Sequence, residues 1–157
     1  MRTLVFFIVT FLSLGGIALA NEQKGEKRRP LVECEQKLCI FSPVVGITSE
    51  NRPPRIFIEN LREFHRFYEK GLRESFSTSN GPENLWWVMA LLRPRCGKEE
   101  WCIEVNIAEE KKGTKRILVV RIFLSEEKDF NAESEAKRAA EKTKMVILSA
   151  KLAFLKA

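Results

Sequence analysis

Residues 85–107 read LWWVMALLRPRCGKEEWCIEVNI and contain two strand patterns on either side of a turn bounded by cysteines. The first pattern, Leu85–Leu92, is apolar at both sets of alternating positions, as in a strand that is buried on both faces. The second, Trp101–Ile107, alternates apolar and polar residues, as a strand with one buried face does. Cys96 and Cys102 bracket the polar residues between them. The stretch therefore predicts an antiparallel hairpin with a disulfide across its turn.

A third strand pattern follows the hairpin. Residues 109–115, EEKKGTK, read as a turn, and Ile117–Leu124 returns as a second run that is apolar on both faces. Pro94 is expected to end the first strand, because proline cannot donate to a ladder of backbone hydrogen bonds. Three strands joined by short turns predict an antiparallel meander.

The N-terminal part repeats the cysteine layout. Leu31–Phe41 contains Cys34 and Cys39 around a short polar segment, which predicts a second stapled hairpin. Four cysteines in an oxidising compartment indicate two disulfides. The repeated layout favours Cys34–Cys39 and Cys96–Cys102, each stabilising by about 2–2.5 kcal/mol in the chain-entropy model. A long-range pair such as Cys34–Cys102, worth about 4 kcal/mol in the same model, remains the alternative.

Two amphipathic helices complete the pattern. From Arg55, apolar residues recur every three or four positions and mark the buried face of a helix. The last helix begins near Asn131 or Ser134, either of which can cap it, and its buried face is mostly alanine in the first half. The two predicted stripes are Phe57, Leu61, Phe64, Tyr68, Leu72 and Phe76 in the first helix, and Ala136, Ala139/Ala140, Thr143, Val146/Ile147, Ala150 and Ala153/Phe154 in the last.

These elements predict an α+β fold. We expect an antiparallel sheet of three to five strands, made of the meander and the short N-terminal hairpin, with Val44–Thr48 as a further candidate strand. Both helices should pack on this sheet. Residues 31–157 are expected to form this single disulfide-stapled domain.

The first 30 residues predict the compartment. Residues 1–20 have the layout of a secretory signal peptide: Arg2 near the start, an apolar run from Leu4 to Ile17, and a small-x-small exit at Ala18–Ala20. Residues 21–30, NEQKGEKRRP, read as a flexible basic tail. We therefore expect an exported protein, periplasmic or secreted. After cleavage no membrane span is expected, because the last apolar run, residues 145–155, is too short and contains Lys151.

Composition argues against several kinds of site. The net charge is +6, but outside the N-terminal tail and the last helix both signs are evenly mixed, which is not typical of a nucleic-acid-binding domain. The chain lacks a C-x-x-C pair and has one histidine, His65, so no metal site is predicted. No glycine-rich phosphate loop is present, and no cofactor is expected. Catalytic residues are not assigned. A triad of His65, Asp129 and a serine is disfavoured, and no glutamate stands out as a general acid.

The two-sided strands predict a binding surface. One helix covers only part of one face of a sheet, so we expect an exposed apolar patch that contains one of Trp86 and Trp87 together with Phe123 or Val119. The function we expect is that of an exported, non-enzymatic domain that binds a protein or an envelope component, with a homodimer as one form of partner. The alternatives are a small envelope hydrolase that uses glutamates and a weak binder of anionic polymers through the basic tail and the last helix.

Overall fold

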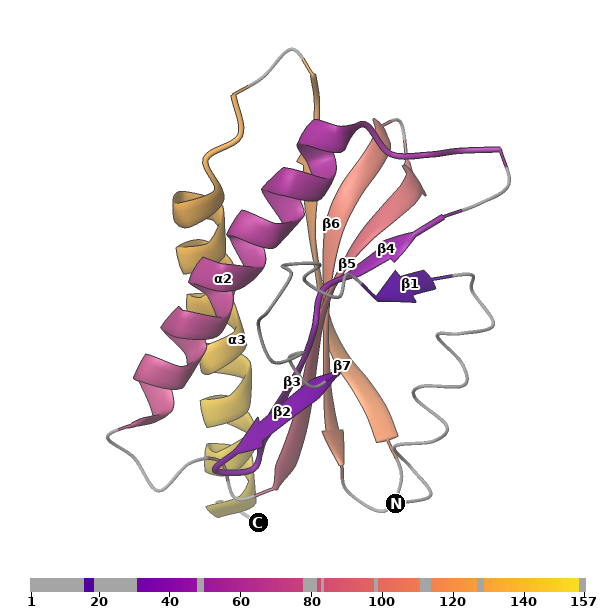
Figure 1. Ribbon diagram of the computed structural model, residues 1–157. Coiled ribbons are helices and arrows are strands. Elements are labelled where there is room, and N and C mark those ends of the chain that lie inside the picture. Colours follow the sequence, from indigo (N-terminus) through magenta and orange to yellow (C-terminus); the bar gives the residue numbers. More distant parts are fainter. Residues whose placement is uncertain are drawn as a thin grey trace, which may run out of the picture.

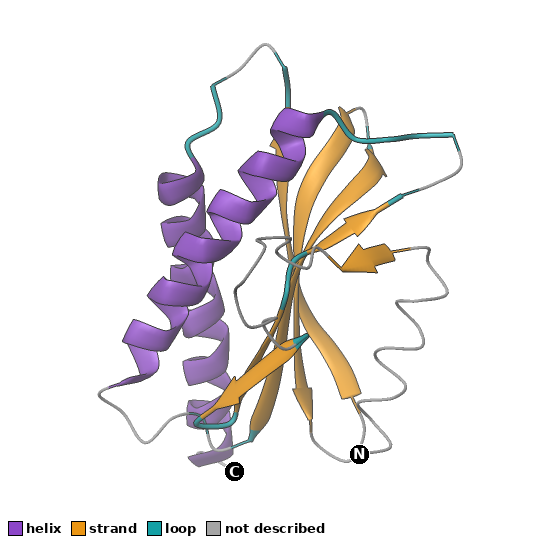
Figure 2. Cartoon of the chain, viewed as in Figure 1, coloured by secondary structure: helices purple, strands orange, loops and turns teal. Residues whose placement is uncertain are grey.

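The protein has two layers, a twisted sheet and a pair of helices (Figures 1 and 2). This computed structural model describes the backbone of residues 16–18, 31–47, 50–77, 82, 84–97, 99–110, 114–126 and 129–155; side chains are described for these residues except 16–18, 99–100, 114–119 and 150–155. Helices α2 (Arg55–Ser77) and α3 (Ala132–Leu155) lie on the same side of the sheet, where α2 contacts β5 and α3 contacts β7. The α+β class is confirmed.

The sheet contains six strands, β2 to β7, and a three-residue strand at its edge, β1. In chain order they are β1 (Gly16–Ala18), β2 (Val32–Glu35), β3 (Leu38–Phe41), β4 (Val44–Gly46), β5 (Leu85–Cys96), β6 (Glu99–Glu110) and β7 (Thr114–Leu124). Strands β5, β6 and β7 form the predicted antiparallel meander. On its other edge β5 pairs with both β3 and β4, and these pair in turn with β2 and β1.

The expectation of a purely antiparallel sheet with at most five strands is wrong. Strands β3 and β4 run parallel to β5, with Leu38 opposite Trp86 and Val44 opposite Leu91. The reason is the connection: the chain leaves β4, passes through the 23-residue helix α2 and enters β5. A crossover of this length joins parallel strands, whereas a tight turn joins antiparallel ones. The two short strands β3 and β4 also add to the strand count.

Both local disulfides are present. Cys34 is bonded to Cys39 and Cys96 to Cys102, so the short-range pairing is confirmed, and no described cysteine is free. Cys34 and Cys39 lie directly opposite one another in the β2–β3 hairpin. Two disulfides suit an oxidising environment.

Strand β5 extends further than predicted. It continues through Pro94 to Cys96, with Pro94 opposite Trp101 of β6. The described pairing with β4 ends at Leu92, and the Pro94 ring lies close to Gly46 of β4, where a Cβ would be 3.3 Å from Pro94 Cδ. Proline is tolerated where ladder pairing on one side of a strand ends, because it has no N–H to donate.

The main core lies between the sheet and the helices. All six apolar residues of the first predicted helix stripe are buried, as are Ala136, Ala139, Ala140, Thr143 and Ile147 of the second; Ala150 and the residues after it have no described side chain. The small residues of α3 let the two helices approach closely: a Cβ on Gly71 of α2 would lie 3.5 Å from the Cβ of Ala140. Asn131 is the cap of α3, since its Oδ1 accepts a hydrogen bond from the Ser134 amide.

The predicted signal peptide and basic tail lie outside the described residues, apart from β1. This strand falls within the predicted signal peptide and pairs antiparallel with β4. In the described part of the chain, no helix has the length and apolarity needed to cross a membrane.

Candidate binding surface

The two faces of the sheet have different surroundings. Side chains of Trp86, Ile103 and Ile122 belong to the core beneath the helices. Their neighbours along each strand point to the opposite side, which we call the helix-free face. It is made of Trp87, Met89, Leu91 and Arg93 from β5, Cys102, Glu104, Asn106 and Ala108 from β6, and Arg121 and Phe123 from β7.

Neither Trp86 nor Trp87 is exposed, so the prediction that one of these two side chains is exposed is wrong. Trp86 is 1% exposed in the helix-side core and Trp87 is 7% exposed on the helix-free face. Trp87 packs against Phe41 of β3, with ring centroids 5.6 Å apart, and its Nε1 donates to the Glu110 carboxylate at 3.0 Å. The parallel strand β3, which sequence reasoning did not place beside β5, brings Phe41 against this indole.

Trp87 is part of a second apolar cluster on the helix-free face. Its buried members are Cys39, Phe41, Trp87, Met89 and Ala108, with Val32, Val44 and Leu85 at its margin. This cluster occupies the half of the face near β3. It explains why Leu85–Leu92 is apolar on both sides, since each side of β5 faces a separate core.

The other half of the helix-free face carries an exposed aromatic ring. Phe123 is 56% exposed and lies opposite Cys102, next to the Cys96–Cys102 disulfide. Val119, the other predicted member from β7, has no described side chain. Of the four predicted surface residues, Phe123 is the one whose exposure the structure shows.

A buried carboxylate lies beside this ring. Glu104 is 2% exposed, and its Oε2 accepts hydrogen bonds from Arg93 Nη1 at 2.8 Å and Arg121 Nε at 3.1 Å. The two arginine side chains are about half exposed, at 45% and 51%. Glu104 lies directly opposite Arg121 in the β6–β7 ladder. Two half-exposed guanidinium groups thus share one buried acceptor, and this bridge uses one of the five N–H donors of each.

Electrostatics at Glu104 argue against a role as a general acid. Burial alone raises the pKa of this carboxyl, but hydrogen bonds from Arg93, Arg121 and Asn106, together with the positive charge of Arg93, outweigh burial and leave the pKa below its ordinary value. A glycosidase-type acid needs a raised pKa in order to hold its proton near neutral pH. Among the described side chains, Glu104 is the acidic residue that is buried, and its pKa is shifted in the wrong direction for a general acid. The hydrolase alternative therefore gains no support from Glu104.

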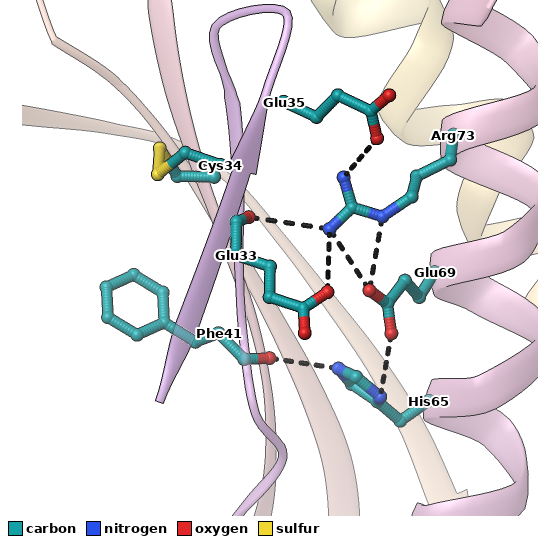
Figure 3. A network of polar contacts seen from close by, with 8 residues as sticks. Glu33, Cys34, Glu35, Phe41, His65, Glu69 and Arg73 are labelled. Carbon is teal, nitrogen blue, oxygen red and sulfur yellow. Dashed lines mark hydrogen bonds and ion pairs between the residues drawn. A yellow bond between two sulfur atoms is a disulfide. The ribbon is translucent and has the colours of Figure 1, made fainter. Parts of the chain in front are cut away.

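A second polar network joins α2 to the N-terminal hairpin (Figure 3). Arg73 contacts Glu69 at 3.1 Å, Glu35 at 3.4 Å and Glu33 at 3.7 Å. His65 bonds through Nε2 to the carbonyl oxygen of Phe41 at 2.9 Å, while Nδ1 lies 3.8 Å from Glu69. A carbonyl only accepts, so Nε2 carries a hydrogen.

This network has a structural role. Glu33 and Glu35 point from β2 toward Arg73, whereas Cys34 points to the other side of the strand (Figure 3). His65 is 9% exposed, and its contacts fix the end of β3 against α2. Asp129 lies in the segment before α3 and is exposed. The disfavoured His65–Asp129 triad therefore gains nothing from the structure.

Within the described residues, no cluster of histidine, cysteine, aspartate or glutamate is suited to hold a metal ion.

A scan of protein-family models finds no match to this chain, and searches of curated proteins and of solved structures find none either.

Sequence reasoning missed the bridge of Glu104 with Arg93 and Arg121. The signal was present: Glu104 follows Ile103 in an alternating strand, and Arg121 is the one charged residue of Ile117–Leu124. Strand alternation places each on the face opposite the apolar majority of its own strand. Knowing that they meet requires the register between β6 and β7, which turn length alone does not fix here.

Proposed function

We propose that this chain is an exported, non-enzymatic binding domain that recognises a partner protein through the helix-free face. The binding surface is centred on Phe123 and flanked by the guanidinium groups of Arg93 and Arg121. The partner that fits it presents an apolar pocket or side chain for Phe123 and carboxylates for the two arginines.

One observation carries this proposal: an exposed aromatic ring lies on the same face of the sheet as two arginines that share one buried glutamate. Phe123 is two residues from Arg121 along β7 and in one row with Arg93 across Cys102. Aromatic residues and arginine are enriched in the energetically dominant part of protein interfaces. Glu104 orients both guanidinium groups before binding, so less side-chain freedom is lost when a partner arrives. A guanidinium also binds a carboxylate through two parallel hydrogen bonds, which adds directional specificity.

Export is supported by sequence and by the two disulfides. The apolar run with a small-x-small exit is typical of a cleaved leader. Both disulfides are local staples of the kind found in exported domains, which fold where thiols are oxidised.

Site-specific photocross-linking tests the surface. A photoreactive phenylalanine derivative replaces Phe123 in one protein and Met145 in another, and each protein is irradiated in its native compartment. Met145 is the matched control, because it is 66% exposed but lies on α3, on the helix side. We expect one discrete adduct from position 123 that is absent from position 145. The adduct is identified by mass spectrometry, and the purified partner is then titrated against the protein.

The titration decides the proposal. Substitution Phe123→Ala should weaken binding by about tenfold or more, as truncation of an interface anchor does. Arg121→Glu should weaken it further by reversing the charge that faces the partner's carboxylates. A partner whose affinity is unchanged by both substitutions would show that binding lies elsewhere on the molecule.

A further inference from the structure

Strand β4 depends on β1 for one of its two neighbours. On one side β4 runs parallel to β5, with Val44 opposite Leu91 and Val45 opposite Leu92. On the other side β1 covers it, with Ala18, Ile17 and Gly16 opposite Val44, Val45 and Gly46. All three β1 residues precede the predicted cleavage site after Ala20. Cleavage would therefore remove this neighbour and leave the backbone N–H and C=O groups of β4 that face β1 without a strand.

The position that β1 occupies beside β4 is bounded at one end by β2. Strand β2 occupies the same outer position beside β3, and the Ser42 amide extends that pairing by donating to the Leu31 carbonyl at 2.8 Å. Figure 1 shows β2 beside β3 and β1 beside β4 along this edge. A strand that replaces β1 meets β2 at one end, so its register against β4 is limited.

Strand β4 is fixed in place by its packing against the core and against β5. Val45 is 1% exposed and packs in the helix-side core. Gly46 approaches β5 so closely that a Cβ would lie 3.1 Å from the carbonyl oxygen of Leu92. A strand fixed in this way loses little conformational freedom when another segment pairs with it.

The other outer strands, β2 and β7, contain charged residues, whereas β4 contains none. Strand β2, VECE, carries two glutamates, and β7 carries Lys115, Arg116 and Arg121. Strand β4, VVG, carries none. Charged side chains discourage pairing at exposed sheet edges, so β4 is the edge that most favours an added strand.

We propose that, in the processed protein, an extended segment of the partner protein pairs antiparallel with β4 in the place of β1. This inference rests on the proposed function, in which residues 1–20 are removed on export. The occupant's chemistry follows from β1: two small residues, opposite Val44 and Gly46, with a β-branched apolar residue between them, opposite Val45. Addition of a strand to a sheet edge is a recurrent mode of peptide recognition.

The edge is continuous with the proposed binding surface. Val44, Leu91, Glu104 and Arg121 form one row across β4, β5, β6 and β7. Three strand spacings, about 14 Å, therefore separate the β4 edge from the Arg121 position. A partner seated on Phe123 and Arg121 can reach β4 with a short extended segment.

The test uses the exported protein as purified, with its N-terminus determined by intact mass. The probe is a synthetic peptide of residues 14–20, LGGIALA, extended by lysines for solubility; the control peptide carries Ile17→Pro, which removes the central backbone N–H. Backbone amide signals of residues 44–46 are followed by NMR as each peptide is added. We expect saturable shifts at these amides with the probe and at least about tenfold weaker binding of the proline peptide.

Each outcome has a distinct meaning. A protein that begins at Asn21 and binds the probe at β4 supports the inference. A protein that begins at Asn21 but binds neither peptide, or both equally, overturns it and leaves export intact. A protein that retains residues 1–20 overturns export and the inference together. A processed protein that is a dimer and dissociates when the probe is added shows a second copy on β4, which overturns the assignment to a separate partner.

Discussion

At the scale of single residues, Glu104 determines how the proposed surface is presented. Its carboxylate takes one hydrogen bond from each of two half-exposed arginines, which come from the strands on either side. Without this shared acceptor the two guanidinium groups would repel one another and adopt many rotamers. The shared bridge therefore links stability and recognition at one position.

The depressed pKa of Glu104 predicts a pH-dependent stability. A carboxyl whose pKa is lower in the folded state than in the unfolded state stabilises the fold above its ordinary value, 4.5, and loses that contribution as pH falls through the folded value. We expect Glu104→Gln to lower the free energy of unfolding by about 1–3 kcal/mol at pH 7. The difference in the free energy of unfolding between Glu104→Gln and the unchanged protein should become smaller as the pH is lowered below 4.5.

Urea unfolding at pH 7 and at pH 3 measures this difference. Glu63→Gln is the control, because Glu63 is an exposed residue of α2 and its loss should change stability by no more than about 0.5 kcal/mol at either pH. A gap for Glu104→Gln that is as large at pH 3 as at pH 7 would contradict the assigned electrostatics.

At the scale of elements, the helix stripes were predictable and the pairing of β3 and β4 was not. The residues from Phe57 to Phe76 carry a strong helical period, so the buried face of α2 follows from the sequence alone. The four residues of β3 and three of β4 carry no comparable signal. Their parallel pairing with β5 depends on how α2 folds back over the sheet, which is a tertiary property.

Helix packing predicts that Gly71→Ala stabilises the protein. Gly71 lies inside α2, where glycine costs about 1 kcal/mol relative to alanine. The new Cβ would meet the Cβ of Ala140 at 3.5 Å, an ordinary contact distance. We expect a gain of about 0.5–1 kcal/mol in chemical unfolding. A loss of stability would mean that α2 and α3 pack more closely than described.

The turn of the first hairpin makes a second prediction at this scale. Gln36 and Lys37 both have positive φ, at 49° and 64°, in a two-residue turn between β2 and β3. Turns of this geometry prefer Asn-Gly, and other residues pay a steric cost there. The double substitution Gln36→Asn/Lys37→Gly should raise the free energy of unfolding by about 0.5–1 kcal/mol, with the Cys34–Cys39 disulfide retained. An unchanged thermal midpoint would show that positive φ at Gln36 and Lys37 does not destabilise the disulfide-bonded hairpin.

At the scale of the whole molecule, the proposed exported protein has a processed N-terminus and two local disulfides. If the leader is removed as proposed, exported material should begin at Asn21 and contain no reactive thiol, because all four cysteines are paired. Intact mass and thiol titration under denaturing conditions test both points. Two or more reactive thiols would contradict the disulfide framework, and a mass that includes residues 1–20 would contradict processing.

The composition and strand patterns predicted the class and the two staples, but they placed the exposed aromatic residue incorrectly. Trp86 and Trp87 are both covered because two different cores lie on the two sides of β5. Phe123 stays exposed because β7 is the last strand of the meander and the second apolar cluster does not reach it. The tertiary fold decides which face of a sheet is buried by strands that are distant in sequence, so this burial could not be predicted from local patterns.

The role of Phe123 as the anchor for a partner is measured by the equilibrium dissociation constant of the cross-linked partner, determined by calorimetry against three processed proteins. These are the unchanged protein, Phe123→Ala and the control Met145→Ala. Both replaced side chains are exposed, so all three should unfold at similar temperatures. We expect Phe123→Ala to weaken binding by about tenfold or more and Met145→Ala to change it by less than about twofold. Equal dissociation constants for all three proteins would show that Phe123 does not anchor the partner.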